Sequence, residues 1–490
     1  MILTFDLGTT VTKAALWDRN GMVGLAEIGI VTDHPAPGWA EQDPTQWWAS
    51  TVAACGRLAG ETSQGLDRVT AIGCTGARQT FGLFDAGGGP LGPGILWSDR
   101  RDLGDAGGGP PQRSAGVDDA SGTPPDGGSV PAKLAWTALH RPTDWERTAW
   151  VLAPRDLVVW RLTGRPVTDP TLASCTGLYD ADGQIVGSHE HMADRLPAVV
   201  PSDQVTGELG REAADALGLR SGLPVVVGAG DRACEVLGTG ATPTGPMVSW
   251  GTTANVSLPI EDPPPGRGRL VVTRAADGGW LLEGGLSGAG SLLAWLGTVC
   301  GHSPAELAAL AAACPPGARG VTAAPWMDGA RAPWWRPHAA AAFVGLSGAH
   351  GPTELARAVF EAVARDVVRC LAVAGECRPS VPPPAVLHLA GAGASAPVWQ
   401  DVLSGISGLP VDRRRSGQAA SAGAALLTAG AVGDGWDLDR LDPVVERSTP
   451  DPAIVEQYDR LRDGADHVAA TLVELGTAGP VGSTGPSTCW

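Results

Sequence analysis

One carboxylate in this sequence stands where an enzyme could use it. Asp231 ends the apolar run LPVVVGAGD, which predicts a strand over residues 223–231, and α/β enzymes gather reactive groups at the carboxyl ends of such strands. There the carboxylate could accept the proton of a hydroxyl group that attacks a phosphorus atom. It could equally cap the helix that follows, a common place for aspartate. This motif alone leaves both readings open.

Two glycine–threonine turns offer groups that bind phosphate. The sequence GTT stands between apolar runs in DLGTTVTKAAL and again in SWGTTANVSL. In the first turn, backbone amides and the hydroxyls of Thr9 and Thr10 could hold a phosphate, with Lys13 as a cation and Asp6 as a carboxylate that attracts Mg²⁺. Either turn alone could be a plain hairpin. Together they favour donors on both sides of a cleft that holds the β- and γ-phosphates of a nucleotide.

A third glycine-rich stretch, LAGAGAS at residues 389–395, lies between a predicted strand and a predicted helix. A nucleotide can approach the backbone closely at such a turn, beside the N-terminus of the helix. The alternative is that these glycines only permit tight packing of the strand against the helix. The stretch alone does not decide between the two.

The elements that must position these motifs can be read from periodicity and turn residues. Alternating apolar residues and an Asn-Gly turn predict three opening strands, at residues 2–6, 11–17 and 22–28. Apolar residues at helical spacing predict helices at 44–58 and 353–374. The second GTT turn also lies within a strand–turn–strand pattern, so the arrangement of the first residues is repeated in the middle of the chain.

This repetition indicates two similar α/β domains that face each other across a cleft. We place the first domain at residues 1–245 and the second at 246–440, with a C-terminal helix and a disordered tail at 441–490. A stretch rich in glycine and proline at 104–130 has no periodicity, and it is expected to be a mobile flap or a disordered insertion.

Composition excludes several classes of protein. The 490-residue chain has a formal net charge of −17, which argues against nucleic acid or an anionic membrane as a partner. No apolar run reaches the roughly 18–20 residues that cross a bilayer. Nine cysteines are scattered without CxxC pairs, which suits a reducing cytoplasm better than a disulfide framework or a zinc site.

Taken together, these segments resemble the FGGY family of carbohydrate kinases, most closely its xylulokinase-like branch. The resemblance runs from residue 2 to about residue 430 and includes GWAEQDPTQWW, ILWSDRR, PRDLVVWRLTG, GAGDRA, DGARAP and AAFVGLSGAHGPTELARAVFE. It implies the actin/hexokinase-like ATPase fold, with two ribonuclease-H-like domains around a cleft. It also implies a kinase that uses ATP and Mg²⁺ to phosphorylate a primary hydroxyl of a small sugar or polyol, such as the ketopentose D-xylulose. Members often dimerise, so a homodimer is possible.

The resemblance also implies a role for individual residues. Asp231 matches the catalytic base of the family and Asp6 the carboxylate near Mg²⁺. The first phosphate loop is matched by Thr9, Thr10 and Lys13. The nucleotide contacts of the second domain are matched by Gly251, Thr252, Gly290, Gly391 and Gly393. The substrate contacts are matched by Arg78, Gln79, Trp97, Asp99 and Arg232.

Two departures from the xylulokinase pattern concern the acceptor. The motif ARQT, which contains Arg78 and Gln79, is nearer to the corresponding motif of glycerol kinases. Arg232 stands where Asn or Gln is usual, and it could hold an anionic polyol or merely pair with an acid. The alternatives are therefore a glycerol, tetritol or pentitol kinase. An ATP-dependent switch on the same fold, without sugar turnover, is a further alternative.

Overall fold

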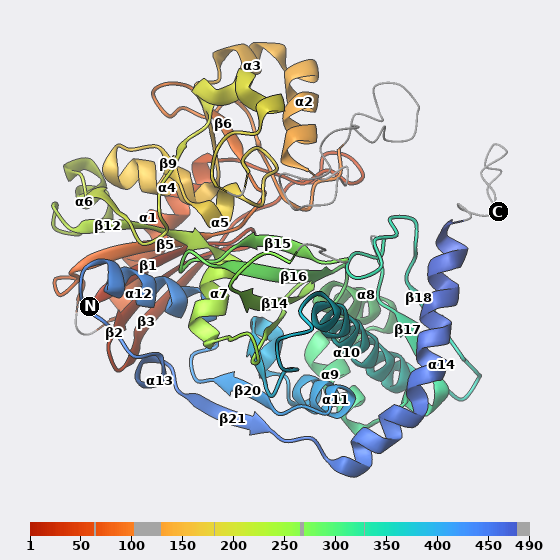
Figure 1. Ribbon diagram of the computed structural model, residues 1–490. Coiled ribbons are helices and arrows are strands. Elements are labelled where there is room, and N and C mark those ends of the chain that lie inside the picture. The colour runs from red at the N-terminus through yellow and green to blue at the C-terminus, as the bar shows by residue number, and fades with distance from the viewer. Residues whose placement is uncertain (63–64, 102–128, 181, 265–268, 328, 478–490) are drawn as a thin grey trace. The chain divides into compact units, whose positions relative to one another are not determined.

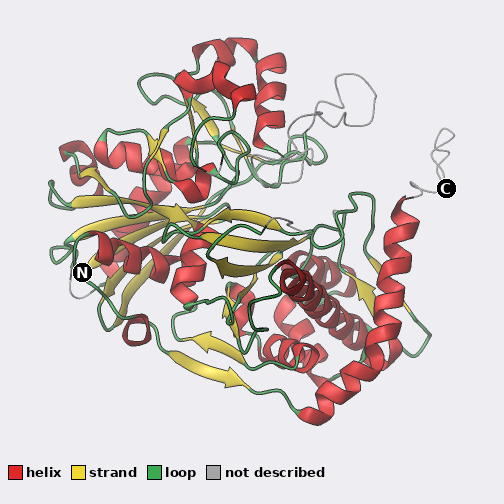
Figure 2. Ribbon diagram, viewed as in Figure 1, coloured by secondary structure: helices red, strands yellow, loops and turns green. Residues whose placement is uncertain are grey.

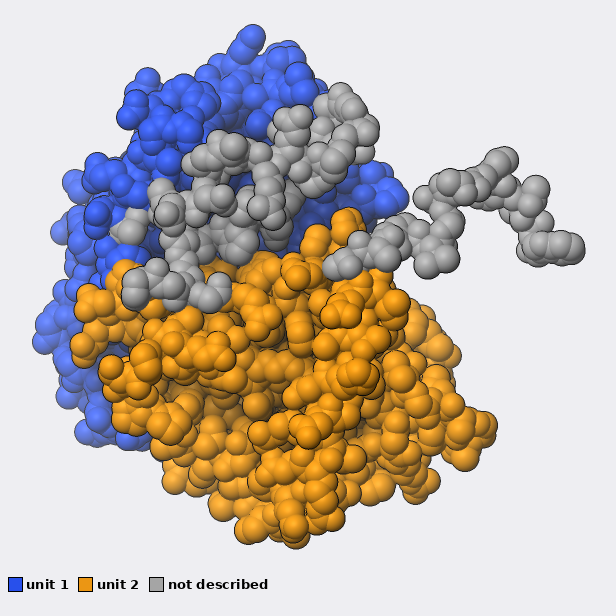
Figure 3. Space-filling model, turned by 45° about the vertical axis from the view of Figure 1, so that its right-hand side comes forward, with its two compact units in different colours: residues 1–240, 272–281, 418–443 blue, residues 241–271, 282–417, 444–490 orange. Residues whose placement is uncertain are grey.

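The computed structural model (Figure 1) describes residues 1–62, 65–101, 129–180, 182–264, 269–327 and 329–477. The chain forms two compact units, which Figure 3 colours separately. Unit 1 contains Met1–Gly240, Val272–Leu281 and Gln418–Pro443, and unit 2 contains Ala241–Val271, Leu282–Gly417 and Val444–Trp490. Most of the expected loop at 104–130 and the expected disordered tail lie outside the described residues.

Unit 1 is built on a six-stranded mixed sheet. Its strand order is β11-β12-β5-β1-β2-β3. The strands are β1 (Ile2–Leu7), β2 (Val11–Asp18), β3 (Gly21–Gly29), β5 (Ala71–Gly76), β11 (Val205–Glu208) and β12 (Pro224–Gly230). β1, β5 and β12 run parallel, whereas β2, β3 and β11 are antiparallel to their neighbours. The carboxyl ends of the three parallel strands therefore lie at one edge of the sheet.

Alternation along β1 sends its side chains to two different layers. Leu3 and Phe5 pack with apolar residues of α1 (Thr45–Glu61) and α4 (Pro154–Thr163). On the other face, Ile2 packs with α12 (Ala419–Ala431), and the Thr4 hydroxyl lies 2.7 Å from that of Ser421. Asp6 continues this second row, so the alternation directs it to the face that α12 covers.

Two helices on that face approach each other with their backbones. α7 (Asp231–Thr239) follows β12 directly, and α12 lies beside it in Figure 1. A Cβ atom on Gly238 would stand 1.9 Å from the Ala419 carbonyl oxygen, and one on Gly423 would stand 1.9 Å from that of Cys234. The segment that contains α12 packs in unit 1, although the sequence placed residues up to 440 in the second domain.

A second, seven-stranded sheet belongs mostly to unit 2, although most of β15 and the start of β16 fall within Val272–Leu281, which is counted with unit 1. Its strand order is β15-β16-β14-β13-β19-β20-β21. The strands are β13 (Met247–Trp250), β14 (Ala254–Ile260), β15 (Val271–Arg274), β16 (Trp280–Leu286), β19 (Leu387–Ala390), β20 (Val411–Arg414) and β21 (Val444–Ser448). Three strands, β13, β19 and β20, run parallel, as β1, β5 and β12 do in unit 1. β14 is antiparallel to β13 and β21 to β20, as β2 is to β1 and β11 to β12. The repetition that the two GTT turns indicated thus extends to five strands of each sheet.

Helices surround both sheets, as Figure 2 shows. In unit 2 they include α8 (Gly290–Cys300), α9 (Pro304–Ala313), α10 (Pro352–Cys377), α11 (Pro397–Ser407) and α14 (Pro452–Thr477). The other helices and short strands of unit 1 are α2 (Val130–His140), α3 (Pro142–Arg147), α5 (Pro170–Ala173), α6 (Arg211–Leu217), α13 (Leu438–Leu441), β4 (Glu41–Gln42), β6 (Gly82–Phe84), β7 (Gly94–Ile95), β8 (Trp150–Leu152), β9 (Val167–Thr168) and β10 (Ala198–Val199), and unit 2 adds β17 (Thr322–Ala324) and β18 (Ala342–Val344). Within the described ranges, no helix combines the length and the apolar character needed to cross a membrane.

Candidate active site

A row of charged side chains crosses the sheet of unit 1 at the open end of β1. Asp6 is paired in register with Lys13 on β2, and Lys13 in turn with Glu27 on β3. The Lys13 Nζ lies 3.3 Å from Glu27 Oε1 and donates a 2.8 Å hydrogen bond to the side chain of Gln418, the residue before α12. Glu27 and Gln418 therefore fix the lysine beside Asp6, and neither was among the predicted site residues.

The environment of Asp6 is that of a carboxylate suited to a cation. Its pKa is raised to about 7, mainly by burial, with the nearby carboxylates of Asp231 and Glu235 acting in the same direction and Lys13 in the opposite one. Among the described residues, no three His, Cys, Asp or Glu side chains are placed to hold a metal ion. Mg²⁺ in kinases is usually bound by one or two carboxylates together with phosphate oxygens and water. Asp6 fits the part of one such ligand.

Asp231 is the first residue of α7, where β12 ends. Its Oδ1 accepts a 2.7 Å hydrogen bond from the backbone N–H of Arg232 and lies 3.8 Å from Nε of Arg78. The side chain is 36% exposed, so a ligand can reach the carboxylate. The guanidinium of Arg232 pairs with Glu235 one turn along the helix. Of the two readings left open for Arg232, the structure shows the pairing with an acid.

Arg78 and Gln79 form the turn that follows β5. Gln79 has a left-handed backbone with φ of 59°, which is uncommon for a residue other than glycine. Its Nε2 donates a 2.9 Å hydrogen bond to the Cys175 carbonyl oxygen, and Nη1 of Arg78 donates to the Cys175 sulfur at 3.2 Å. The structure thus joins Arg78 to Asp231 on one side and both turn residues to Cys175 on the other. Cys175 was not predicted from the sequence.

Trp97 and Asp99 lie in a neighbouring segment with different surroundings. The Trp97 N–H donates to the Thr80 hydroxyl at 3.1 Å, so this segment is attached to the turn of Arg78 and Gln79. The Asp99 side chain has no exposed surface, and Arg101 donates to both of its carboxylate oxygens. Burial alone would raise the pKa of Asp99, but hydrogen bonds from Arg101 and the Ala40 N–H bring it below its usual range. Asp99 thus holds Arg101 in place.

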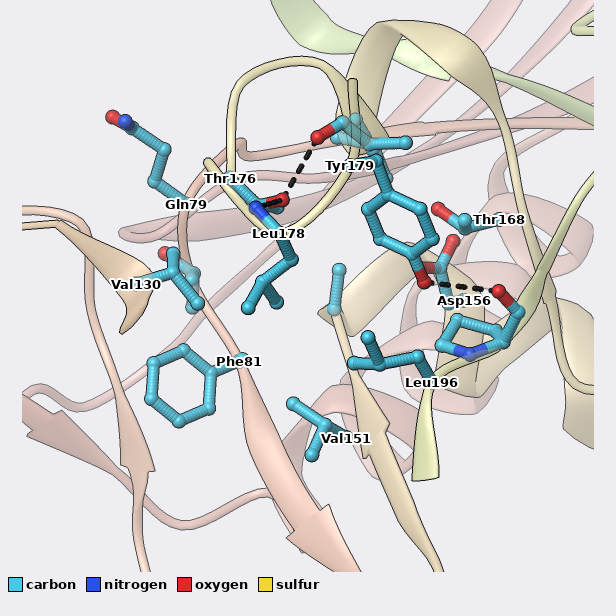
Figure 4. Close-up of a pocket in the computed structure, with 15 residues that line it drawn as sticks. Gln79, Phe81, Val130, Val151, Asp156, Thr168, Thr176, Leu178, Tyr179 and Leu196 are labelled. Atoms are coloured by element: carbon cyan, nitrogen blue, oxygen red, sulfur yellow. Dashed lines mark hydrogen bonds between the residues drawn. The ribbon is translucent and has the colours of Figure 1, made fainter. Parts of the chain in front are cut away.

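A cavity of about 40 Å³ lies behind Gln79. Figure 4 shows Gln79 at one end and Tyr179 and Asp156 at the other, with Phe81 and Val151 along the wall. The Tyr179 hydroxyl donates to a backbone carbonyl at 3.0 Å. Most of the lining is apolar, and burial raises the pKa of Asp156 to about 6 although the guanidinium beside it acts in the opposite direction.

The raised pKa of Asp156 predicts a pH-dependent stability. Between about pH 4 and pH 6 the folded protein keeps a proton that the unfolded chain has released, so this contribution to stability is lost as pH rises through 6. We expect the free energy of unfolding of Asp156→Asn, minus that of the wild type, to rise by up to about 3 kcal/mol from pH 4 to pH 7. Urea unfolding at both pH values measures this difference. Asp182→Asn, at a side chain that is 84% exposed, is the control, and an equal shift in both variants would contradict the prediction.

The first GTT turn joins β1 to β2 and requires glycine. A Cβ on Gly8 would stand 2.8 Å from the Val11 carbonyl oxygen. The Thr9 carbonyl accepts a 2.5 Å hydrogen bond from the side chain of Gln42, which anchors the turn, and Thr10 is exposed. The backbone and hydroxyl groups of this turn therefore border solvent at the end of β1, the strand that carries Asp6.

In unit 2 the second GTT turn is closed by the start of α8. The N–H groups of Gly290 and Ser291 donate 3.0 Å hydrogen bonds to the carbonyls of Gly251 and Thr252. A Cβ on Gly290 would stand 2.6 Å from the Gly251 carbonyl oxygen, so only glycine fits there without a shift. Thr252 is exposed at the tip of the turn.

The glycine-rich stretch of unit 2 packs on the same strand end. A Cβ on Gly391, whose φ is 82°, would stand 2.3 Å from the Trp250 carbonyl oxygen, and one on Gly393 would stand 2.0 Å from the indole ring. Tight packing, one of the two alternatives for this stretch, is thus observed. It also brings Gly391 and Gly393 to the end of β13, where Gly251, Thr252 and Gly290 meet.

Comparisons with known proteins match both units. The model of the FGGY family of carbohydrate kinases, N-terminal domain, matches residues 1–238, and that of the C-terminal domain matches residues 247–432. The xylulose kinase of Escherichia coli is 32% identical over 443 residues, covering 87% of this chain and 89% of that protein. A glycerol kinase of Cereibacter sphaeroides is 30% identical over 488 residues, covering 92% and 96%. The solved structure of xylulose kinase from Rhodospirillum rubrum matches with a TM-score of 0.83 at 30% identity, covering 97% of this chain and 99% of that one.

Proposed function

The chain belongs to the FGGY family of carbohydrate kinases, and from this premise we propose that it phosphorylates a primary hydroxyl of a ketopentose such as D-xylulose. The predicted family, the α/β fold of the sugar kinases and the class of phosphotransferase are confirmed by these matches. ATP is the phosphoryl donor of the family. The choice of D-xylulose rests on the similarity to xylulose kinases over most of the chain.

The observation that carries the mechanism is the position of Asp231. Its carboxylate is partly exposed at the end of β12, with the Arg78 guanidinium 3.8 Å away and the half-buried Asp6 among its charged neighbours. In the proposed reaction Arg78 and Gln79 bind hydroxyl groups of the acceptor. The acceptor oxygen forms a bond to the γ-phosphorus, the bond from that phosphorus to the ADP oxygen breaks, and Asp231 takes the hydroxyl proton.

The candidates in the two GTT turns and in the glycine-rich stretch of unit 2 are assigned to the nucleotide. In unit 1 we assign phosphate contacts to the turn of Thr9 and Thr10 and to Lys13. In unit 2 we assign nucleotide contacts to the groups that meet at the end of β13, namely Gly251, Thr252, Gly290, Gly391 and Gly393. Asp6 would hold Mg²⁺ in part, and the ion would supply positive charge to the phosphates of the nucleotide.

A polyol acceptor is the second candidate. The glycerol kinase of Cereibacter sphaeroides is nearly as similar to this chain as the xylulose kinase of Escherichia coli. Because Arg232 pairs with Glu235, we assign contacts with the acceptor to Arg78 and Gln79 and not to Arg232. Arg78 and Gln79 resemble the corresponding glycerol kinase motif. A switch without turnover is the third alternative, and it would not need the exposed carboxylate of Asp231.

One experiment separates these functions. Purified protein is incubated with ATP, Mg²⁺ and one acceptor from a panel of ketopentoses, pentitols, tetritols, glycerol and gluconate, and ADP is measured with a coupled assay. We expect the highest kcat/KM with D-xylulose. A higher value with glycerol or a tetritol would move the function to a polyol kinase. If no acceptor stimulates ADP release while the protein still binds ATP, the ATP-dependent switch is the function that remains.

The role of Asp6 leads to a prediction about metal dependence. Asp6→Asn removes the negative charge offered to Mg²⁺ while keeping the shape of the side chain. We expect the Mg²⁺ concentration for half-maximal rate to rise by at least about tenfold. Titration of activity with MgCl₂ at saturating ATP measures it, with Asp67→Asn on an exposed turn as the control. An unchanged Mg²⁺ requirement would remove Asp6 from the metal site.

A further inference from the structure

One short segment outside the assigned site residues contacts both parts of the chain that carry the acceptor chemistry. Residues 169–175, here called the bridging segment, include the short helix α5. Thr171 in this segment bonds to the strand end before Asp231, and Cys175 bonds to Arg78 and Gln79. The segment therefore lies between the candidate base and the candidate acceptor contacts.

Thr171 fixes the peptide from which Asp231 projects. Its hydroxyl accepts a 2.7 Å hydrogen bond from the N–H of Gly230 and donates a 2.6 Å hydrogen bond to Asp169. Thr171 and Asp169 are both fully buried. Gly230 precedes Asp231 and has an extended backbone that turns the chain from β12 into α7. A hydroxyl is needed at position 171, because a buried N–H without an acceptor is costly.

Asp169 anchors the other end of the segment to the same strand. It forms a buried ion pair with Arg155 at 2.7 Å and accepts a 2.7 Å hydrogen bond from Ser202. Arg155 donates to the carbonyls of Val227 and Gly228 at 2.9 and 2.8 Å, and both belong to β12. The bridging segment is thus held to β12 at two points, which leaves Thr171 little freedom to shift.

Cys175 connects this anchored segment to the acceptor contacts. Its thiol donates to the Thr171 carbonyl at 3.1 Å and receives the hydrogen bond from Arg78 Nη1, while its own carbonyl accepts from Gln79. The side chain is 4% exposed, so a ligand cannot take over these contacts without displacing it. Arg78 and Gln79 therefore take their position from the same segment as Asp231.

We propose that the bridging segment is a positioning element that sets the Asp231 carboxylate and the Arg78–Gln79 turn at a fixed separation. It acts through Thr171 on the base and through Cys175 on the acceptor contacts. The inference rests on the proposed function and goes beyond it, since neither residue is among those assigned to the substrate or the nucleotide. It predicts that the two residues affect different kinetic constants.

Two pairs of variants test this division. Thr171→Val removes the hydroxyl at nearly constant volume, and Thr171→Ser keeps it. Cys175→Ala removes the sulfur, and Cys175→Ser keeps a group that can both donate and accept. Thr176→Val is the matched control, because within the described part of the chain the Thr176 hydroxyl bonds to its sequence neighbours Ala173 and Leu178 and to no assigned site residue. For each variant kcat, KM for the acceptor and KM for ATP are measured with the acceptor that the wild-type enzyme prefers.

We expect Thr171→Val to lower kcat by at least about tenfold with little change in KM for the acceptor, since small misplacement of a catalytic group is expensive. Cys175→Ala is expected to raise KM for the acceptor by about tenfold with a smaller change in kcat. The serine variants should recover most of each loss, and KM for ATP should stay within about twofold throughout.

Three results would overturn the proposal. The first is that Thr176→Val reproduces the loss seen in Thr171→Val. The second is that Thr171→Val and Cys175→Ala change kcat and KM in the same proportion. The third is that neither Thr171→Val nor Cys175→Ala changes kcat or KM. Should Thr171→Val fail to fold, the Cys175 pair decides alone. The proposed function fails separately, when the wild-type enzyme phosphorylates no acceptor of the panel; an active wild type with unchanged variants counts against the bridging segment only.

Discussion

Asp231→Ala is expected to lower kcat for the sugar by about 10²–10⁴-fold, the range that a general base contributes. The carboxylate at the end of β12 is the partly exposed acid beside Arg78, and alanine cannot take the hydroxyl proton. ATP contacts are assigned to other residues, so the dissociation constant for ATP should stay within about threefold. Coupled ADP detection measures the turnover, and isothermal titration measures the binding of ATP.

The helix-cap reading of Asp231 supplies the control. Glu212 is an acid in the first turn of another helix, α6, where it can only stabilise the helix end. Glu212→Gln and Asp231→Ala should therefore lose similar, small amounts of stability if Asp231 is merely a cap, and both should keep their activity. Asp231→Asn adds a variant that preserves shape. Near-normal turnover by either Asp231 variant would remove the assignment of the base.

Gly391→Ala is expected to weaken ATP binding by more than about 100-fold and to lower the free energy of unfolding by more than about 3 kcal/mol. The added Cβ would meet backbone atoms of Trp250 at 2.3–3.0 Å, and no side-chain rotation can relieve a contact with backbone. The end of β13 must then shift, and it carries the Gly251 turn that is assigned to the nucleotide. Isothermal titration with ATP and urea unfolding measure the two effects.

Gly408 separates the contact from the backbone strain. It also has a left-handed backbone, with φ of 69°, but a Cβ there would meet nothing closer than 3.8 Å. Gly408→Ala should cost about 1 kcal/mol and leave ATP binding unchanged. If both variants bind ATP equally well, the turn at Gly391 does not position the nucleotide site.

The strands of both halves were predictable because their signals are local. The Asn-Gly turn and the alternation of apolar residues predicted strands at 11–17 and 22–28, and the structure places β2 at Val11–Asp18 and β3 at Gly21–Gly29. The helix expected at 353–374 is observed at Pro352–Cys377. In each case neighbouring residues alone decide whether one face of the element is apolar, so the sequence is sufficient.

The candidate site was predictable only in part, for a physical reason. Motif residues such as Asp6 and Lys13 lie in one hairpin, and their spacing reveals that they face each other. The partner that fixes Lys13 is Gln418, which is 405 positions away along the chain. Cys175 is 97 positions away from Arg78. Such partners are brought in by tertiary packing, and a single sequence carries no periodicity or turn signal for them.

The late arrival of α12 in unit 1 has a consequence for biosynthesis. Ile2, Ala15 and Trp17 on β1 and β2 are buried by Ala422, Ala425 and Ala429, so the first sheet has a bare apolar face while the ribosome translates the intervening residues. At about 5–20 residues per second this exposure lasts on the order of ten seconds or more. Nascent chains of this enzyme are expected to need a chaperone during that interval. For the same reason, a gene truncated after Gly240 is expected to yield aggregates and not a folded half.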